Sequence, residues 1–150
     1  MRGVRLQLVQ VLVVFSGFSF LLHFVWELLQ SPLYSSLRYV SHTEALAVCT
    51  RATAGDVGIA VAAYAAAATV QGDTLWILRA QGRTWSAYML AGLGITVLFE
   101  YLATGPLERW TYAPQMPRLP LLGTGLAPLL QWLLLPPLAA WFTYRHSRKC

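Results

Sequence analysis

The residues best suited to chemistry in this chain are a histidine and a glutamate inside its first long apolar segment. His23 and Glu27 lie in the stretch FLLHFVWELLQSPLY, which runs from Phe20 to Tyr34. Residues four apart lie one above the other on the same face of an α-helix. An ionisable side chain inside a membrane segment is costly and normally faces the protein interior or a wet cavity. The pair therefore predicts a polar site within a membrane bundle.

Other polar groups could meet this pair. The same helical face would carry Ser16, Phe20 and Gln30, and also Tyr34 if the helix continues past Pro32. Each of the other three apolar segments adds a polar side chain: Asp56, Glu100 and Gln131. We expect these groups to share one half of the bilayer and to line a pocket that opens to the outer side or to the lipid.

A buried carboxyl group and an imidazole together suit proton transfer. Burial favours the neutral form of a carboxyl group, whereas a neighbouring imidazole favours its charged form. Such a pair can protonate one carbon of an apolar substrate and deprotonate another. The same carboxylates could instead hold a ligand amine among aromatic rings. A metal is the weaker alternative, because the HxxxE spacing is unspecific and the apolar segments contain no second histidine. We therefore expect no metal and no cofactor.

The candidate residues follow from this chemistry. We expect His23 and Glu27 to transfer protons, and Asp56 and Glu100 to stabilise a cationic intermediate. Further side chains on the apolar segments are candidates for contact with the ligand: Trp26, Gln30, Tyr64, Thr96, Gln131 and Trp132.

Each of the distant polar groups also has a purely structural interpretation. Asp56 follows a glycine before an apolar run and could be a helix N-cap. Glu100 could be solvated at the headgroup level beside Arg109. Gln131 could serve only to bind neighbouring helices together.

The composition is that of a membrane protein. Of the 150 residues, 57% are hydrophobic and 11% are charged, and the mean hydropathy is +0.52. A soluble domain carries about a quarter charged residues. The net charge is +5, but the basic residues form no face with interleaved aromatic residues, so nucleic-acid binding is not expected. Cys49 and Cys150 are far apart in the sequence and form no CxxC motif.

We predict an all-α fold, a four-helix transmembrane bundle forming one domain. The four spans are expected at about 6–30, 56–78, 86–104 and 121–144. The second span could instead end at Gln71–Asp73, and Gly58, Ala60, Ala63 and Ala67 would give it a small-residue surface. The segment 31–54 reads as a polar connection. The segment 105–120 reads as an ordered interfacial loop, with Trp110 and Tyr112 at the headgroup level.

The distribution of basic residues predicts the orientation. If both termini are cytoplasmic, seven of the eleven basic residues lie inside: Arg2, Arg5, Arg79, Arg83, Arg145, Arg148 and Lys149. The remaining four then lie outside: Arg38, Arg51, Arg109 and Arg118. The positive-inside rule favours this arrangement.

The polar positions and their flanking residues resemble a known family. The motifs are HFVWE, the acid at the start of the second span, LFEY at the end of the third, and APLLQWLLLPPL before a basic tail. Together they resemble the EXPERA family, which includes a sterol double-bond isomerase and the sigma-2 receptor. The resemblance covers the four spans but depends on short motifs. In the isomerase, an asparagine and a tryptophan three residues apart lie on the last helix, whereas Gln131 and Trp132 are adjacent here.

This resemblance implies a four-helix membrane fold with cytosolic termini and a lipid-sized pocket. It also implies that His23 and Glu27 correspond to the isomerase pair, and that Glu27 and Asp56 correspond to the receptor's two acids. The expected function is isomerisation, or a related proton transfer, on a sterol- or terpenoid-like lipid. The alternatives are a non-catalytic receptor for lipids or hydrophobic amines, and a small transporter subunit. The expected partners are a lipid or hydrophobic small molecule and a second copy of the chain. The expected location is the bacterial inner membrane or the endoplasmic reticulum.

Overall fold

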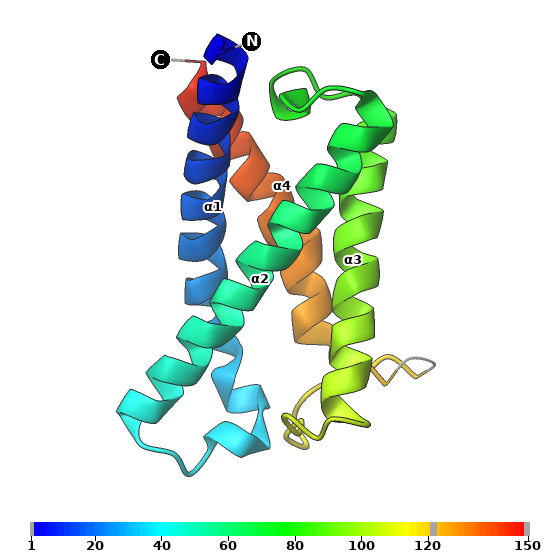
Figure 1. Cartoon of the computed structure of the whole chain (residues 1–150). Coiled ribbons are helices and arrows are strands. Elements are labelled where there is room, and N and C mark those ends of the chain that lie inside the picture. Colours follow the sequence, from blue (N-terminus) through cyan, green and yellow to red (C-terminus); the bar gives the residue numbers. More distant parts are fainter. Residues whose placement is uncertain (1, 121–122, 149–150) are drawn as a thin grey trace.

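Four long helices dominate the computed structural model, which describes residues 2–120 and 123–148 (Figure 1). The helices are α1 (Arg2–Gln30), α2 (His42–Gln71), α3 (Gly82–Thr104) and α4 (Leu126–Ser147). Each is long and apolar enough to cross a membrane. No β-strand forms among the described residues, so the predicted all-α four-helix fold is confirmed.

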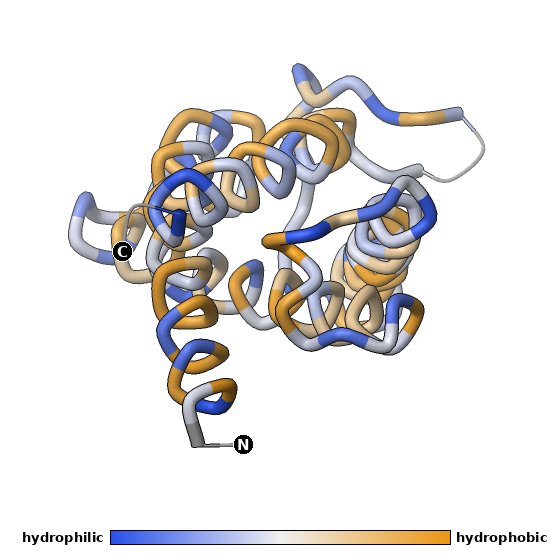
Figure 2. Tube along the Cα trace, turned by 90° about the horizontal axis from the view of Figure 1, so that it is seen from above, coloured by the Kyte–Doolittle hydropathy of each residue, from blue (hydrophilic) through white to orange (hydrophobic). Residues whose placement is uncertain are grey.

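The helices do not stand parallel. α1 and α3 lie on opposite sides, and α2 and α4 cross the bundle obliquely, each packing against both (Figure 1). The first residues of α1 and the last residues of α4 lie at the same end of the bundle, which we call the terminal end. The opposite end, which we call the loop end, carries the α1–α2 and α3–α4 connections. Apolar residues occur along the length of every helix (Figure 2). Many of the large ones are exposed on the outside of the bundle, as contact with lipid requires.

α1 ends where the sequence places its first proline. The helix stops at Gln30, and Pro32 occupies the first turn of the short 3₁₀ helix η1 (Ser31–Leu33), where its missing N–H costs nothing. The buried face of α1 differs from the predicted stripe. Ser19 is fully buried together with His23, whereas Ser16 and Phe20 are partly exposed.

α2 begins fourteen residues before the predicted start of the second span. Ser41 is its N-cap: the Ser41 hydroxyl accepts from the Glu44 backbone N–H, and the Glu44 carboxylate accepts from the Ser41 backbone N–H. This capping box stabilises the start of α2 at His42, so the second half of the predicted polar connection 31–54 is helical. The predicted N-cap role of Asp56 is therefore wrong, since Asp56 lies about 21 Å along α2 at 1.5 Å per residue.

The end of α2 follows the shorter of the two predicted alternatives. Gly72 adopts a left-handed conformation with φ 71° and caps the helix. The residues Leu75–Leu78 do not extend the helix. Instead, the 3₁₀ helix η3 (Trp76–Leu78) inserts Trp76 into the core, where its indole N–H donates to the Tyr64 carbonyl at 3.0 Å. Ala60, Ala63 and Ala67 form the predicted small-residue surface, whereas Gly58 is exposed.

The other helices also differ from their predicted limits. α3 begins at Gly82 rather than 86. α4 begins at Leu126, and the predicted start at Leu121 lies outside the described residues. α4 continues through Pro136 and Pro137, so these prolines do not interrupt it.

The two connections at the loop end are joined by backbone hydrogen bonds. The Ser35 N–H donates to the Thr111 carbonyl at 3.0 Å, and the Ala113 N–H donates to the Leu33 carbonyl at 2.8 Å. These bonds place Tyr34 opposite Tyr112 in an isolated bridge. The segment 105–120 is therefore ordered, as predicted, but Tyr112 is buried rather than exposed at the headgroup level.

Candidate functional site

The polar residues of three helices meet inside the bundle at Gln131. From α4, the Gln131 amide nitrogen lies 2.8 Å from His23 Nδ1 of α1 and 2.8 Å from Asp56 Oδ2 of α2. It also lies 3.4 Å from Glu27 Oε1. We call His23, Glu27, Asp56, Gln30 and Gln131 the polar cluster.

Gln30 completes the polar cluster. Its side-chain amide donates to Glu27 Oε1 at 2.7 Å and to Gln131 Oε1 at 3.2 Å. Its own carbonyl oxygen accepts from the Trp26 indole N–H at 3.1 Å. Trp26 therefore contacts the cluster through Gln30. Because every amide of the cluster donates and accepts, the two glutamines hold both carboxylates in fixed positions.

His23 occupies the deepest position of the polar cluster. Its side chain is fully buried, and its Nδ1 also lies 3.3 Å from Asp56 Oδ2. Its Nε2 has no hydrogen-bond partner in the described part of the chain. The imidazole packs edge-on against the Trp132 ring, with 5.6 Å between centroids. One ring nitrogen is thus fixed by groups from two helices, and the other is buried without a hydrogen bond.

Both tautomers of His23 leave Nε2 without a protein partner. If Nδ1 accepts from Gln131, the ring proton lies on Nε2. If Nδ1 carries the proton, it can donate to Asp56, and Nε2 is left with a free lone pair. Moving one proton between Nε2 and the Nδ1–Asp56 pair interconverts these states. This is the arrangement that a proton carrier requires.

Trp132 separates the polar cluster from α3. Its ring packs directly on Gly92: a Cβ atom at that position would lie 2.4 Å from the Trp132 ring. Trp132 Nε1 has no partner among the described residues, and neither does Thr96 Oγ1, one turn further along the same face of α3. Trp132 and Thr96 therefore add unpaired polar atoms to the interior beside the cluster.

Glu100 forms a second, separate polar group. Its carboxylate accepts from the Tyr112 hydroxyl, and Trp110 Nε1 lies 3.4 Å from the same carboxylate. The Tyr112 hydroxyl in turn accepts from the Gly125 backbone N–H at 3.0 Å. Glu100 is only 8% exposed, so the interpretation of a solvated residue beside Arg109 is wrong.

Tyr112 is the proton donor in this second group. Burial raises the pKa of Tyr112 above its ordinary value, and the hydrogen bond to Glu100 raises it further. The phenol therefore stays protonated and donates to the carboxylate. The predicted interfacial position of Tyr112 is therefore wrong, since its hydroxyl points inward to Glu100. Its only sequence signal is the aromatic, proline-rich composition of the loop.

Tyr64 lies away from both groups. Its hydroxyl donates to the Thr74 carbonyl at 2.7 Å, and its ring packs against Phe15 and Trp76. These contacts belong to the aromatic core near the terminal end. Tyr64 is therefore not a neighbour of the polar cluster, although it was a predicted ligand contact.

The polar cluster does not line either of the two best-defined surface pockets of the described chain. One of these pockets lies between η3, α3 and α4, and the other lies beside the α3–α4 connection, so neither reaches His23, Glu27 or Asp56. Asp56 is 16% exposed and Glu27 is half-buried, so the carboxylates can be reached from one side. No group of three His, Cys, Asp or Glu side chains within residues 2–120 and 123–148 could hold a metal ion.

Comparisons of this chain with protein-family models, with curated proteins and with solved structures found no match. The EXPERA resemblance therefore stays a prediction from short motifs.

Proposed function

We propose that this protein is a membrane-embedded enzyme that moves protons on an apolar lipid, as an isomerase does. One observation carries the proposal: His23 Nε2 is buried and unpaired, while Nδ1 of the same ring is held by Gln131 and Asp56. Fixing one ring nitrogen sets the orientation of the other, which is how a general acid–base histidine is usually positioned.

The surroundings of Nε2 favour an apolar substrate. The ring lies within four membrane-spanning helices and against the indole of Trp132. A double bond placed beside Nε2 could take a proton on one carbon, and the resulting carbocation would be stabilised by Asp56 and Glu27. Transfer of a proton from a neighbouring carbon back to the Nε2 lone pair would complete the isomerisation and restore the starting state of His23. A sterol- or terpenoid-like lipid has both the double bond and the apolar body, and the compartment would be a bacterial inner membrane or the endoplasmic reticulum.

Incorporation of deuterium tests this reaction. The purified full chain, in detergent, is incubated in deuterated water with a panel of sterols and polyprenyl lipids, and the lipids are analysed by mass spectrometry. We expect one lipid to return as an isomer with deuterium on carbon. His23→Ala should abolish the label, whereas His42→Ala should not, because His42 is exposed at the start of α2.

A binding protein for hydrophobic amines is the second candidate. It is favoured by the two partly accessible carboxylates, Glu27 and Asp56, which share one amide donor and could pair with an ammonium. Both candidates predict that Asp56→Asn weakens binding of a tertiary amine. They differ in turnover: a lipid that binds but returns unchanged and unlabelled contradicts the enzyme and favours the receptor.

A further inference from the structure

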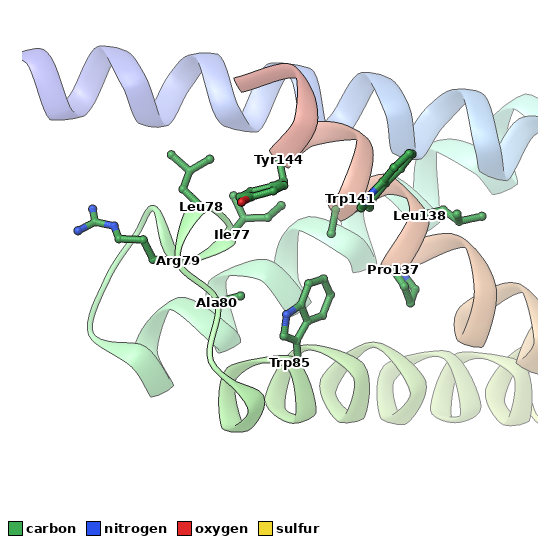
Figure 3. A pocket seen from close by; sticks show the side chains of 10 residues that line it. Ile77, Leu78, Arg79, Ala80, Trp85, Pro137, Leu138, Trp141 and Tyr144 are labelled. Carbon is green, nitrogen blue, oxygen red and sulfur yellow. The ribbon is translucent and has the colours of Figure 1, made fainter. Parts of the chain in front are cut away.

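A groove at the terminal end of the bundle lies apart from the polar cluster. It has a volume of about 710 Å³ and runs between the η3 segment, the start of α3 and the last turns of α4. This volume is within the range of small-molecule sites, about 300–1,000 Å³. Figure 3 shows Trp85 pointing from α3 toward η3 and α4, and Trp141 and Tyr144 on the last turns of α4 also line the groove.

The walls of the groove are apolar. Six aliphatic residues and two tryptophans form most of the lining: Ile77, Leu78, Ala80, Pro137, Leu138, Ala140, Trp85 and Trp141. Leu138 and Trp141 are 43% and 50% exposed. A surface of this kind matches an acyl chain, because eight of its ten lining residues are aliphatic or tryptophan.

The rim of the groove is cationic. Arg79 lines it directly, and the Arg79 side chain is 70% exposed. The Arg145 guanidinium lies 5.7 Å from the centre of the Trp141 ring, and Arg148 donates to the Tyr144 hydroxyl at 2.7 Å. The opposing charge at this rim is Asp73, whose carboxylate lies 3.6 Å from Arg79. Among the described residues, three arginines and one carboxylate lie at this rim, which leaves it positive.

The position of the groove connects these two properties. It lies at one end of four membrane-spanning helices, so its cationic rim falls at the headgroup level and its apolar walls fall at the acyl level. Basic pockets between transmembrane helices bind anionic lipid headgroups. A zwitterionic lipid would gain little from three arginines.

We propose that this groove binds one anionic phospholipid of the bilayer, with its phosphate at Arg79 and Arg145 and one acyl chain between Trp85 and Trp141. The site is distinct from the polar cluster and does not depend on the reaction proposed there. It would hold η3 and the last turns of α4 together, since the lipid contacts both.

Photo-crosslinking tests the occupant. The full chain is placed in phosphatidylcholine nanodiscs that contain a small fraction of phosphatidylglycerol with a diazirine on one acyl chain. The cross-linked peptides are then identified by mass spectrometry. We expect the label on residues 76–85 and 137–144. An equal fraction of phosphatidylcholine with the same diazirine should label these peptides at least about fivefold less, because each arginine contributes about that factor.

Variants separate the rim from general surface charge. The double variant Arg79→Gln, Arg145→Gln should lower the phosphatidylglycerol label by more than about tenfold. Arg5→Gln is the matched control, since Arg5 is an exposed arginine on α1 that does not line the groove, and should change the label by less than about twofold.

Filling the groove tests the acyl site. Leu138→Trp should block labelling, whereas Leu133→Trp, the same substitution at an exposed α4 residue outside the groove lining, should not. Equal labelling by the two lipids, an equal effect of Arg5→Gln, or no effect of Leu138→Trp would each overturn the proposal. Cross-links from groove residues to a second protein chain, in place of lipid, would assign the groove to an interface between copies and would also overturn it.

Discussion

At the scale of single residues, Gln131 is the contact on which the polar cluster depends. It is the one residue of α4 that reaches groups on both α1 and α2 within the described chain. A glutamine amide suits this position because it donates twice and accepts once without adding a charge. The sequence allowed two roles for Gln131: to hold neighbouring helices together, or to contribute to the site. The same hydrogen bonds would serve either role.

Replacing Gln131 with methionine should destabilise the protein. The side chain keeps its length, but Asp56 and His23 lose their shared donor, at a cost of about 1–3 kcal/mol for each buried acceptor left unpaired. Denaturation by increasing sodium dodecyl sulfate would measure this loss. Gln10→Met is the control, because Gln10 is exposed on α1. An unchanged unfolding midpoint for Gln131→Met would mean that the amide contributes no net stability.

At the scale of the helices, the contact of α3 with α4 depends on a glycine. Gly92 faces the ring of Trp132, and there is no room between them for a methyl group. This close approach fixes the position of Trp132. The Trp132 ring also packs against the His23 imidazole. The packing of α3 on α4 therefore reaches the polar cluster through one aromatic side chain.

Gly92→Ala should consequently weaken the bundle. The added Cβ would lie 2.4 Å from the Trp132 ring, and overpacking of this kind costs about 1–3 kcal/mol. Gly94→Ala, two residues along, meets nothing within 4 Å and should instead stabilise α3 by about 0.5–1 kcal/mol. Thermal unfolding in detergent compares the two variants. A Gly92→Ala protein as stable as Gly94→Ala would show that Trp132 can move aside freely.

At the scale of the whole molecule, the two ends of the chain lie at the same end of the bundle, as an even number of spans requires. The side of the membrane that this end faces is predicted by the basic residues alone. The groove with the three arginines is at this end as well. A cytoplasmic terminal end would place its cationic rim in the leaflet that usually carries anionic lipid.

Cysteine labelling in intact cells would measure this orientation. A membrane-impermeant maleimide should leave Cys150 unlabelled if the termini are cytoplasmic, and should label a cysteine introduced at the exposed Ser36 of the loop end. Cys49 is buried and contributes little background. Labelling of Cys150 together with protection of Ser36→Cys would reverse the orientation.

The sequence by itself determined the class of the fold and the residues worth attention. Hydrophobic runs of about 20 residues are long enough to span a bilayer, and a helix satisfies its backbone hydrogen bonds within the segment, as lipid requires. Polar groups in such runs are rare, and this rarity distinguishes four residues: His23, Glu27, Asp56 and Gln131. The sequence also carries a local signal for the start of α2, because Ser41 and Glu44 have the spacing of a capping box.

Only the tertiary structure decided which of these residues meet. Asp56 reaches Gln131 because α2 is longer than its apolar part and crosses the bundle obliquely, which the hydropathy of one segment cannot reveal. Glu100 and Tyr64 share the same sequence signals but contact Tyr112 and Thr74 instead. A helical period fixes which residues share one face of one helix. The angle and register between helices depend on close contacts such as Gly92 on Trp132, which exist only once the chain has folded.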